Sequence, residues 1–207
     1  MDTLSLPTLL AFFATAIAIE LTPGPNMAYL AILGVARGRV AGLFAVTGVA
    51  LGLAIVGGLA AIGLAALISE IDWLYQAIRW AGILYLIWLG YDTWRDARRP
   101  IEQHALAVSN WVFFRRGLVT NLLNPKAAAF YLAVLPNFLA DVATPSAFLV
   151  LAAIYVLAAT LVHTIIVMGA SALQPYFVQP QHRERLGIVF GLLLVVIAIW
   201  LFIATRA

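Results

Sequence analysis

The stretch Leu21-Thr22-Pro23-Gly24-Pro25-Asn26 interrupts a long apolar segment that runs from about Leu4 to Leu33. Pro23 and Pro25 donate no backbone hydrogen bonds, and their rings clash with the preceding turn, so an ideal helix cannot continue through them. In a lipid bilayer, a broken backbone persists only where protein or a water-filled cavity covers it. The sequence therefore predicts a break that is buried inside the protein or lines a cavity within it.

The composition around this break is typical of an integral membrane protein. Of the 207 residues, 64% are hydrophobic and 10% are charged, whereas an ordinary soluble domain carries about 25% charged residues. There is no cysteine, no room for a soluble catalytic domain, and no GxSxG, HExxH or phosphate-binding glycine-rich motif. We therefore expect no enzyme, no cofactor and no metal site. The net charge of +3 lies in short loops, so we also expect no nucleic-acid partner.

Six apolar segments are long enough to cross a hydrocarbon core of about 30 Å. They cover approximately residues 7–33, 41–68, 73–94, 117–139, 145–173 and 186–204. The predicted fold class is thus an all-α integral membrane protein, with residues 1–207 as a single transmembrane domain in contact with lipid. The glycines Gly187 and Gly191 form a GxxxG pair, which allows close helix packing either within one chain or across a homodimer.

The loops between these segments carry an asymmetric charge that predicts the orientation. Nine arginines lie outside the segments on one side of the membrane: Arg37, Arg39, Arg95, Arg98, Arg99, Arg115, Arg116, Arg183 and Arg185. The opposite side holds Arg206 as its basic residue, with acidic residues at Glu70, Asp72 and Asp141. The positive-inside rule places the nine arginines in the cytoplasm, so both termini are expected outside it.

A second break, Asn121-Leu122-Leu123-Asn124-Pro125-Lys126, opens the fourth segment, and Pro125 stands 100 residues after Pro25. Each half of the chain has three segments and begins with an interrupted one, so the halves would enter the membrane from opposite sides. This pattern is typical of an inverted repeat with its binding site at the matching breaks. We predict repeats over about 1–95 and 112–207, joined by a cytoplasmic linker at about 95–116.

Both breaks are expected near the middle of the membrane. Asn26 lies 11 residues before Arg37, and Lys126 lies 10 residues after Arg116. These separations place each break about 15–16 Å from the cytoplasmic edge. Half-helices that start at prolines would meet there from opposite directions, and the free N–H groups and dipoles of their N-termini attract anions.

Lys126 is the residue that most favours a ligand site. A cation in the first turn of a half-helix opposes the helix dipole and is costly at this depth, which makes sense if the site binds a carboxylate. The alternative is that Lys126 snorkels to the inner interface, a long reach from this depth. The asparagines would cap freed backbone groups and contact a ligand. The predicted substrate-binding residues are Pro23, Gly24, Pro25, Asn26, Asn121, Asn124, Pro125 and Lys126.

Two further titratable residues are candidates for proton coupling. Glu20 lies near the C-terminal end of the first half-helix, where it could bind a proton, bind the ammonium of a zwitterion, or form a salt bridge with Lys126. His163 lies in the middle of the fifth segment. It could relay protons because histidine titrates near physiological pH, or it could be a neutral side chain hydrogen-bonded between helices. The sequence leaves these alternatives open.

Three stretches resemble the lysine exporter (LysE/RhtB) family: Thr22-Pro-Gly-Pro-Asn26 with the following Ala36-Arg37-Gly38 and Gly42, then residues 81–90, and then residues 121–131. The resemblance extends over essentially the whole chain. It implies a proton-driven exporter of amino acids or related small zwitterions in the cell (inner) membrane. Pro23, Gly24, Pro25, Asn26, Asn124, Pro125 and Lys126 fall in the signature regions of the family, whereas Glu20 and His163 do not.

Two other functions stay open at this stage. A passive channel for small polar solutes would need a continuous polar lining, which the almost wholly apolar segments 41–68 and 186–204 do not provide. A non-transporting subunit of a membrane complex would leave the cost of Lys126 and Glu20 at membrane depth unexplained. The sequence does not specify the substrate, the coupling ion or the oligomeric state.

Overall fold

All regular structure in the described residues is helical. The computed structural model describes residues 4–63, 72–98, 108–139, 144–177 and 180–204. Its α-helices are α1 (Leu6–Glu20), α2 (Pro25–Ala61), α4 (Asp72–Ala97), α6 (Asn110–Leu122), α7 (Pro125–Ala129), α8 (Pro145–Ser171), α9 (Gln174–Phe177) and α10 (Pro180–Ala204). A π-helix, η1 (Phe130–Val134), and a 3₁₀-helix, η2 (Leu135–Phe138), follow α7. The predicted all-α fold class is therefore confirmed for these residues.

Helices lie in all six apolar segments, although residues 64–68 of the second segment lie outside the described residues, and only some of the helices are clear membrane spans. Among the described residues, α2 and α8 are each long and apolar enough to cross a membrane. The pair formed by α6 and residues Pro125–Phe138 is a third candidate, bent by 51° at the break between them. Two further helices, α1 and Gly187–Trp200 within α10, are apolar but shorter. Six crossings arranged as an inverted repeat stay a prediction.

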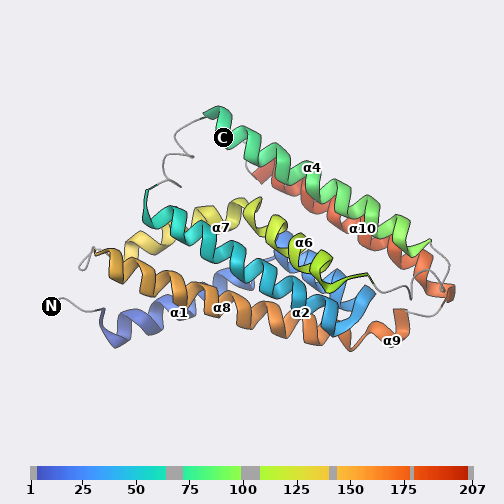
Figure 1. Ribbon diagram of the computed structural model, residues 1–207, viewed down its shortest axis with the longest axis horizontal. Helices are drawn as coiled ribbons and strands as arrows, with labels where there is room; N and C mark the ends of the chain where they lie inside the picture. Colours follow the sequence, from blue (N-terminus) through green and yellow to red (C-terminus); the bar gives the residue numbers. More distant parts are fainter. Residues whose placement is uncertain (1–3, 64–71, 99–107, 140–143, 178–179, 205–207) are drawn as a thin grey trace.

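The loop expected between the first two segments is reduced to one residue. Gly38 has a φ of 82° and a ψ of −177°, in a region of backbone space that glycine enters without steric cost, and helix continues on both sides of it. Figure 1 shows the chain doubling back at this point of α2. A Cβ at Gly38 would also collide with the side chain of Gln174 in α9. The helical segment 25–37 is thus a separate half-helix, joined by a tight turn to residues 39–61.

Two helices begin earlier than the hydropathy predicted. α6 begins at Asn110 rather than at residue 117, so Arg115 and Arg116 are helical instead of lying in a loop. α10 begins at Pro180 rather than at residue 186 and likewise includes two arginines assigned to a loop. The physical reason is that arginine is a good helix former whose long side chain reaches water from within a helix. Hydropathy marks the end of the apolar segment and not the end of the helix.

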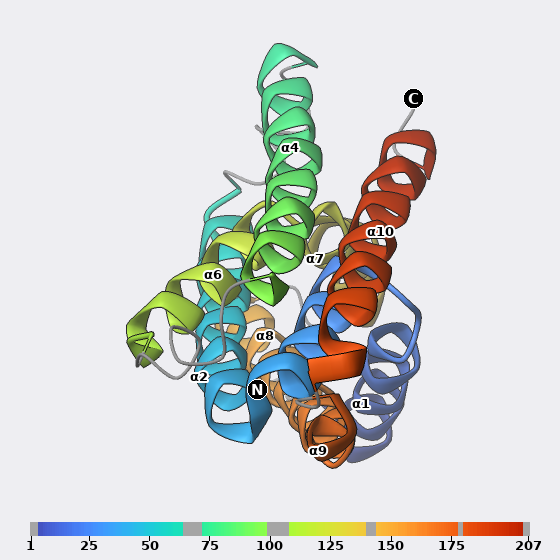
Figure 2. The ribbon, with the colours of Figure 1, turned by 90° about the vertical axis from the view of Figure 1, so that its right-hand side faces the viewer.

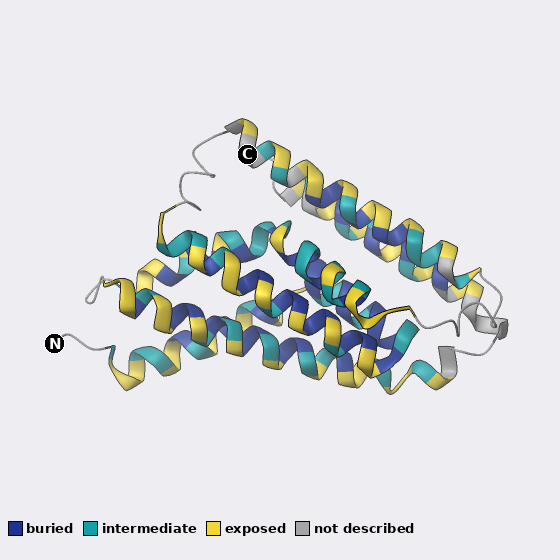
Figure 3. Ribbon diagram, viewed as in Figure 1, coloured by how far each residue is buried: buried dark blue, intermediate teal, exposed yellow. Residues whose placement is uncertain are grey.

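The main bundle consists of α2 packed against α6 and α8, with α1 lying along α8 (Figures 1 and 2). Glycines of α2 allow this close approach: a Cβ at Gly52 would lie 2.9 Å from the Cβ of Asn121, and one at Gly57 would lie 2.8 Å from the ring of Tyr131. Figure 3 shows buried residues where these helices face one another and exposed residues on their outer faces. The core therefore sits along α2, beside both breaks.

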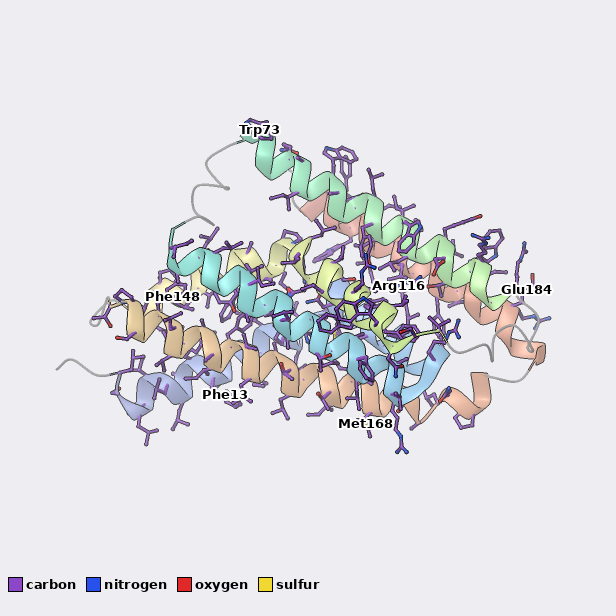
Figure 4. The ribbon with its side chains drawn as sticks, viewed as in Figure 1. Phe13, Trp73, Arg116, Phe148, Met168 and Glu184 are labelled. Carbon is purple, nitrogen blue, oxygen red and sulfur yellow. The ribbon has the colours of Figure 1, made fainter. Side chains whose placement is uncertain are left out.

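Helices α4 and α10 form an antiparallel pair on one side of this bundle (Figures 1 and 2). Their contact is close, because a Cβ at Gly90 would lie 2.8 Å from the carbonyl oxygen of Gly191, and Gly187 faces Ala97. The predicted GxxxG pair thus serves packing within the chain, while a homodimer stays a prediction. Helix α4 is also held to α6 by an ion pair of 2.8 Å between Asp92 of α4 and Arg116 of α6. Figure 4 shows Arg116 between α4 and α6.

Candidate functional site

The first break separates α1 from α2. Helix α1 closes with backbone bonds from the N–H of Leu21 to the carbonyl of Ile17 at 2.9 Å and from the N–H of Thr22 to that of Ile19 at 3.0 Å. The new helix begins at Pro25, with Gly24 as its N-cap in an extended conformation. The carbonyl of Leu21 would accept from residue 25 in a continuous helix, and a proline has no N–H to give. The end of α1 therefore presents carbonyl oxygens that its own helix cannot satisfy.

The second break, between α6 and α7, has the same local design. Asn124 is the N-cap of α7, and its Oδ1 accepts a hydrogen bond from the backbone N–H of Lys126 at 3.1 Å. Pro125 is the first residue of the new helix, as Pro25 is in α2, where the missing N–H costs nothing. After one short turn α7 passes into the π-helix η1, a local distortion that is frequent at functional sites.

Lys126 joins the two breaks. Its Nζ donates a hydrogen bond of 2.9 Å to the carbonyl oxygen of Thr22. A Cβ placed on Gly24 would lie 3.5 Å from Cδ and 4.0 Å from Nζ of the same lysine. The half-buried side chain thus extends across to the other break. An ammonium group has three donors, and since the bond to Thr22 is the one that Nζ makes within the described residues, two are left for a ligand.

Glu20, the last residue of α1, is 5% exposed and is held by two residues of α8. The hydroxyl of Tyr155 donates to Oε1 at 2.7 Å, and Nε2 of His163 lies 3.1 Å from Oε2. The histidine contact is a close approach of Nε2 to Oε2 without the alignment of a hydrogen bond, and neither ring nitrogen has a hydrogen-bond partner among the described residues. Within the described part of the chain no ion pair joins Glu20 to Lys126, although the two charges attract one another through space. The carboxylate is therefore paired with His163 and not with the lysine.

Tyr155 is a site residue that the sequence interpretation missed. Its ring stacks on Phe130 with the centroids 3.6 Å apart, and Tyr131 meets it edge-on at 5.2 Å. These contacts fix the hydroxyl on Glu20, while the hydroxyl of Tyr131 is used elsewhere, in a bond of 3.0 Å to the carbonyl of Leu53. The spacing between Tyr155 and His163 could have identified this tyrosine from the sequence. Tyr155 lies about two helical turns before His163 and therefore on the same face of α8.

Several buried polar atoms near the breaks have no hydrogen-bond partner in the part of the chain that the structure describes. They include Oδ1 of Asn26 in the first turn of α2 and Oδ1 of Asn121 in the last turn of α6. The amide nitrogen of Asn121 is used, since it donates to the carbonyl of Val49 at 3.3 Å. Buried polar atoms in native proteins are nearly always paired, so each such atom calls for a partner that the described residues do not supply.

The structure thus sorts the predicted site residues into two neighbouring groups. Gly24 and Lys126 meet where the two breaks touch, together with Thr22, which was not among the predicted site residues, and Pro25 and Asn26 are buried in the same break. Glu20 and His163 meet in the second group, together with the additional Tyr155. The groups are linked through α1, because Glu20 precedes Thr22 by two residues. Asn124 organises the second break as a cap, and Pro23 is exposed at the first.

Comparison with known proteins covers both groups. A family model described as LysE type translocator matches residues 17–205. The chain is 34% identical over 177 residues to a leucine efflux protein of Enterobacter sp. (strain 638), which covers 83% of each protein. It is 35% identical over 127 residues to the threonine efflux protein of Escherichia coli (strain K12), covering 58% of this chain and 61% of that one.

Two further relatives carry no functional name. The chain is 34% identical over 140 residues to the uncharacterized membrane protein YahN of Escherichia coli (strain K12), covering 65% of this chain and 63% of the relative. It is 33% identical to an uncharacterized membrane protein of Vibrio cholerae serotype O1, with 64% of that protein covered. The alignments thus span somewhat less than two thirds of these relatives. No solved structure matches the chain.

Proposed function

The chain belongs to the LysE type translocator family, and we propose that it is a secondary-active exporter of amino acids or related small zwitterions. By their names, two relatives export leucine and threonine, each of which carries one carboxylate and one ammonium group. The observation that carries the proposal is the bond from Lys126, in the first turn of α7, to the carbonyl of Thr22, at the end of α1, because this bond joins the two breaks. The protein would act in the inner (plasma) membrane as a multi-pass protein with both termini outside the cytoplasm.

In this proposal the substrate carboxylate binds between the two helix N-termini. The first N–H groups of α2 lack partners within the helix and carry the positive end of its dipole. In α7 the N–H groups of Lys126 and Ala127 are already bonded to Asn124, so this helix contributes chiefly the charge of Lys126. Lys126 adds two unused donors and a full positive charge. Gly24 supports the same role, because a residue without Cβ lets a ligand approach the backbone closely.

The substrate ammonium needs acceptors, and the site offers them. Oδ1 of Asn26 and Oδ1 of Asn121 are buried acceptors without a donor. An ammonium group that donated to either atom would remove the cost of leaving that atom unpaired. A zwitterion would then lie with its carboxylate at the helix N-termini and its ammonium toward the asparagines, which favours α-amino acids over simple carboxylates.

We propose that the pair of Glu20 and His163 couples export to the proton gradient. A buried carboxylate and imidazolium stabilise one another, and a change in the protonation of either one removes the attraction. Because Glu20 is the last residue of α1, such a change in protonation alters the charge directly beside the first break. Alternating access would then rock one three-helix repeat against the other around the two breaks. A passive channel would need no such pair.

The first test is thermal stabilisation of the purified protein by a panel of amino acids. A ligand at a hundredfold excess over its Kd stabilises the folded state by about 2.7 kcal/mol. We expect at least one neutral amino acid to raise Tm, and we expect this effect to be lost in Asn26→Ala. The control is Asn137→Ala, which should keep the effect because the side chain of Asn137 is exposed on η2. A hit that persists in Asn26→Ala would refute the proposed site. Absence of any hit, together with no saturable export from proteoliposomes under a pH gradient, would refute the exporter.

A further inference from the structure

The end of α1 has the features of a cation site. The C-terminal end of a helix carries the negative end of its dipole, and unwound carbonyls of broken membrane helices bind cations. Here Pro25 removes the N–H that would otherwise satisfy the carbonyl of Leu21, whereas the carbonyl of Ile19, opposite Pro23, accepts from the N–H of Thr22. The buried carboxylate of Glu20 adds negative charge two residues before Thr22.

The end of α1 is in contact with a positively charged side chain from the other half of the chain. Nζ of Lys126 donates to the carbonyl of Thr22 at 2.9 Å from the first turn of α7. Lys126 is the only lysine in the 207 residues, since every other basic residue counted with it is an arginine. A lysine presents a compact ammonium of unit charge on a flexible stem, whereas an arginine presents a broad planar fork. The compact group is the one that can replace a small monovalent ion.

We propose that the C-terminal turn of α1, residues 20–22, is a monovalent-cation site that Lys126 occupies as a tethered cation. The proposal deepens the proposed function, on which it rests, by stating which ion couples: export by this chain requires no alkali ion and depends on protons alone. It also assigns a second task to Lys126. A substrate carboxylate that attracts the ammonium competes with the carbonyl of Thr22, so substrate binding weakens the bond that holds the two breaks together.

The test measures Tm of the purified full-length protein in four chloride salts of equal ionic strength: sodium, potassium, methylammonium and N-methylglucamine. The variants are Lys126→Ala and, as a matched loss of one positive charge, Arg98→Ala, whose guanidinium forms an exposed ion pair with Glu184 far along the chain. We expect wild type and Arg98→Ala to have the same Tm in all four salts. Lys126→Ala should have a lower Tm that sodium or methylammonium raises saturably, by roughly 3–6 °C at about tenfold excess over Kd.

A second variant keeps the test decisive if Lys126→Ala cannot be purified. Lys126→Met keeps the aliphatic stem and loses the ammonium, and the same salt dependence is expected of it. The proposal is overturned if neither variant is stabilised by a small cation beyond the effect of N-methylglucamine, or if sodium raises the Tm of wild type as much as that of the variants.

The amino-acid panel, run in parallel on wild type, separates this proposal from the exporter. An amino-acid hit without a cation response in the Lys126 variants refutes the cation site and leaves the exporter standing. A cation response in the variants, without an amino-acid hit or export by wild type, refutes the exporter and leaves the cation site standing.

Discussion

Nε2 of His163 lies 3.1 Å from Oε2 of Glu20, and this contact joins the middle of α8 to the last residue of α1. A carboxylate that is removed from water needs a partner, and here the histidine and the hydroxyl of Tyr155 provide one for each oxygen. The two candidates for proton coupling thus form one unit. Because Glu20 lies two residues before Thr22, this unit is placed directly behind the contact between the two breaks.

Replacement of Glu20 by glutamine should uncouple export from the proton gradient. The variant keeps the shape of the side chain but can no longer carry the charge that pairs with His163. With one proton per substrate, wild type should accumulate substrate about tenfold for each pH unit across the membrane, and Glu20→Gln should lose this response while retaining substrate exchange at equal pH. The measurement is transport in proteoliposomes with and without a pH gradient. Glu184→Gln, an exposed carboxylate on α10, is the control and should behave as wild type. A full gradient response in Glu20→Gln would contradict the coupling role.

Removal of one hydroxyl should distinguish Tyr155 from its neighbour Tyr131. Tyr155→Phe loses a bond to a carboxylate, worth about 1.5–3 kcal/mol, and Tyr131→Phe loses a bond to a backbone carbonyl, worth about 0.5–1.5 kcal/mol. Both variants should therefore have a lower Tm. Only Tyr155→Phe should change the pH at which export is half-maximal, because only that hydroxyl touches the titrating unit. Identical pH profiles in the two variants would reduce Tyr155 to a packing role.

The N-cap of α7 should matter for binding as well as for stability. Asn124→Ala removes the acceptor for the N–H of Lys126, and the loss of a cap costs about 1 kcal/mol. Ser109→Ala removes the comparable cap of α6, whose oxygen accepts from the N–H of Trp111. We expect similar decreases in Tm for both variants, but weaker stabilisation by the amino-acid ligand in Asn124→Ala alone. An equal ligand response in both would separate the second break from the binding site.

Close packing of α4 on α10 should make Gly90 intolerant of a methyl group. Gly90→Ala places a Cβ about 2.8 Å from the carbonyl oxygen of Gly191, an overpacking that typically costs about 1–3 kcal/mol. Gly169→Ala is the control, since its Cβ would meet no atom within 4 Å and alanine is favoured over glycine in a helix by about 0.5–1 kcal/mol. Thermal unfolding should show a lower Tm for the first variant and an unchanged or higher Tm for the second. The opposite order would show that the two helices are not in contact in the membrane.

Local chemistry explains which parts of the fold could be predicted from sequence. Pro25 and Pro125 have no N–H, so helices must restart there whatever surrounds them, and both do so with the proline as first residue. Hydropathy similarly located the helices, because apolar length is a property of each segment. It failed at Arg116, which lies inside α6, because the helix continues beyond the apolar residues until its basic side chains reach Asp92 or water.

The sequence by itself therefore determined where the chain must break, which ends of the half-helices are left unsatisfied and that Lys126 and Glu20 lie beside them. Only the tertiary structure decided which partners these charges take. Lys126 could have reached the interface or Glu20, and instead it reaches the carbonyl of Thr22, while Glu20 pairs with His163. The reason is that these contacts join α1, α7 and α8, which come from both halves of the chain. Their relative positions follow from the packing of the whole bundle on α2, which no local pattern of residues specifies.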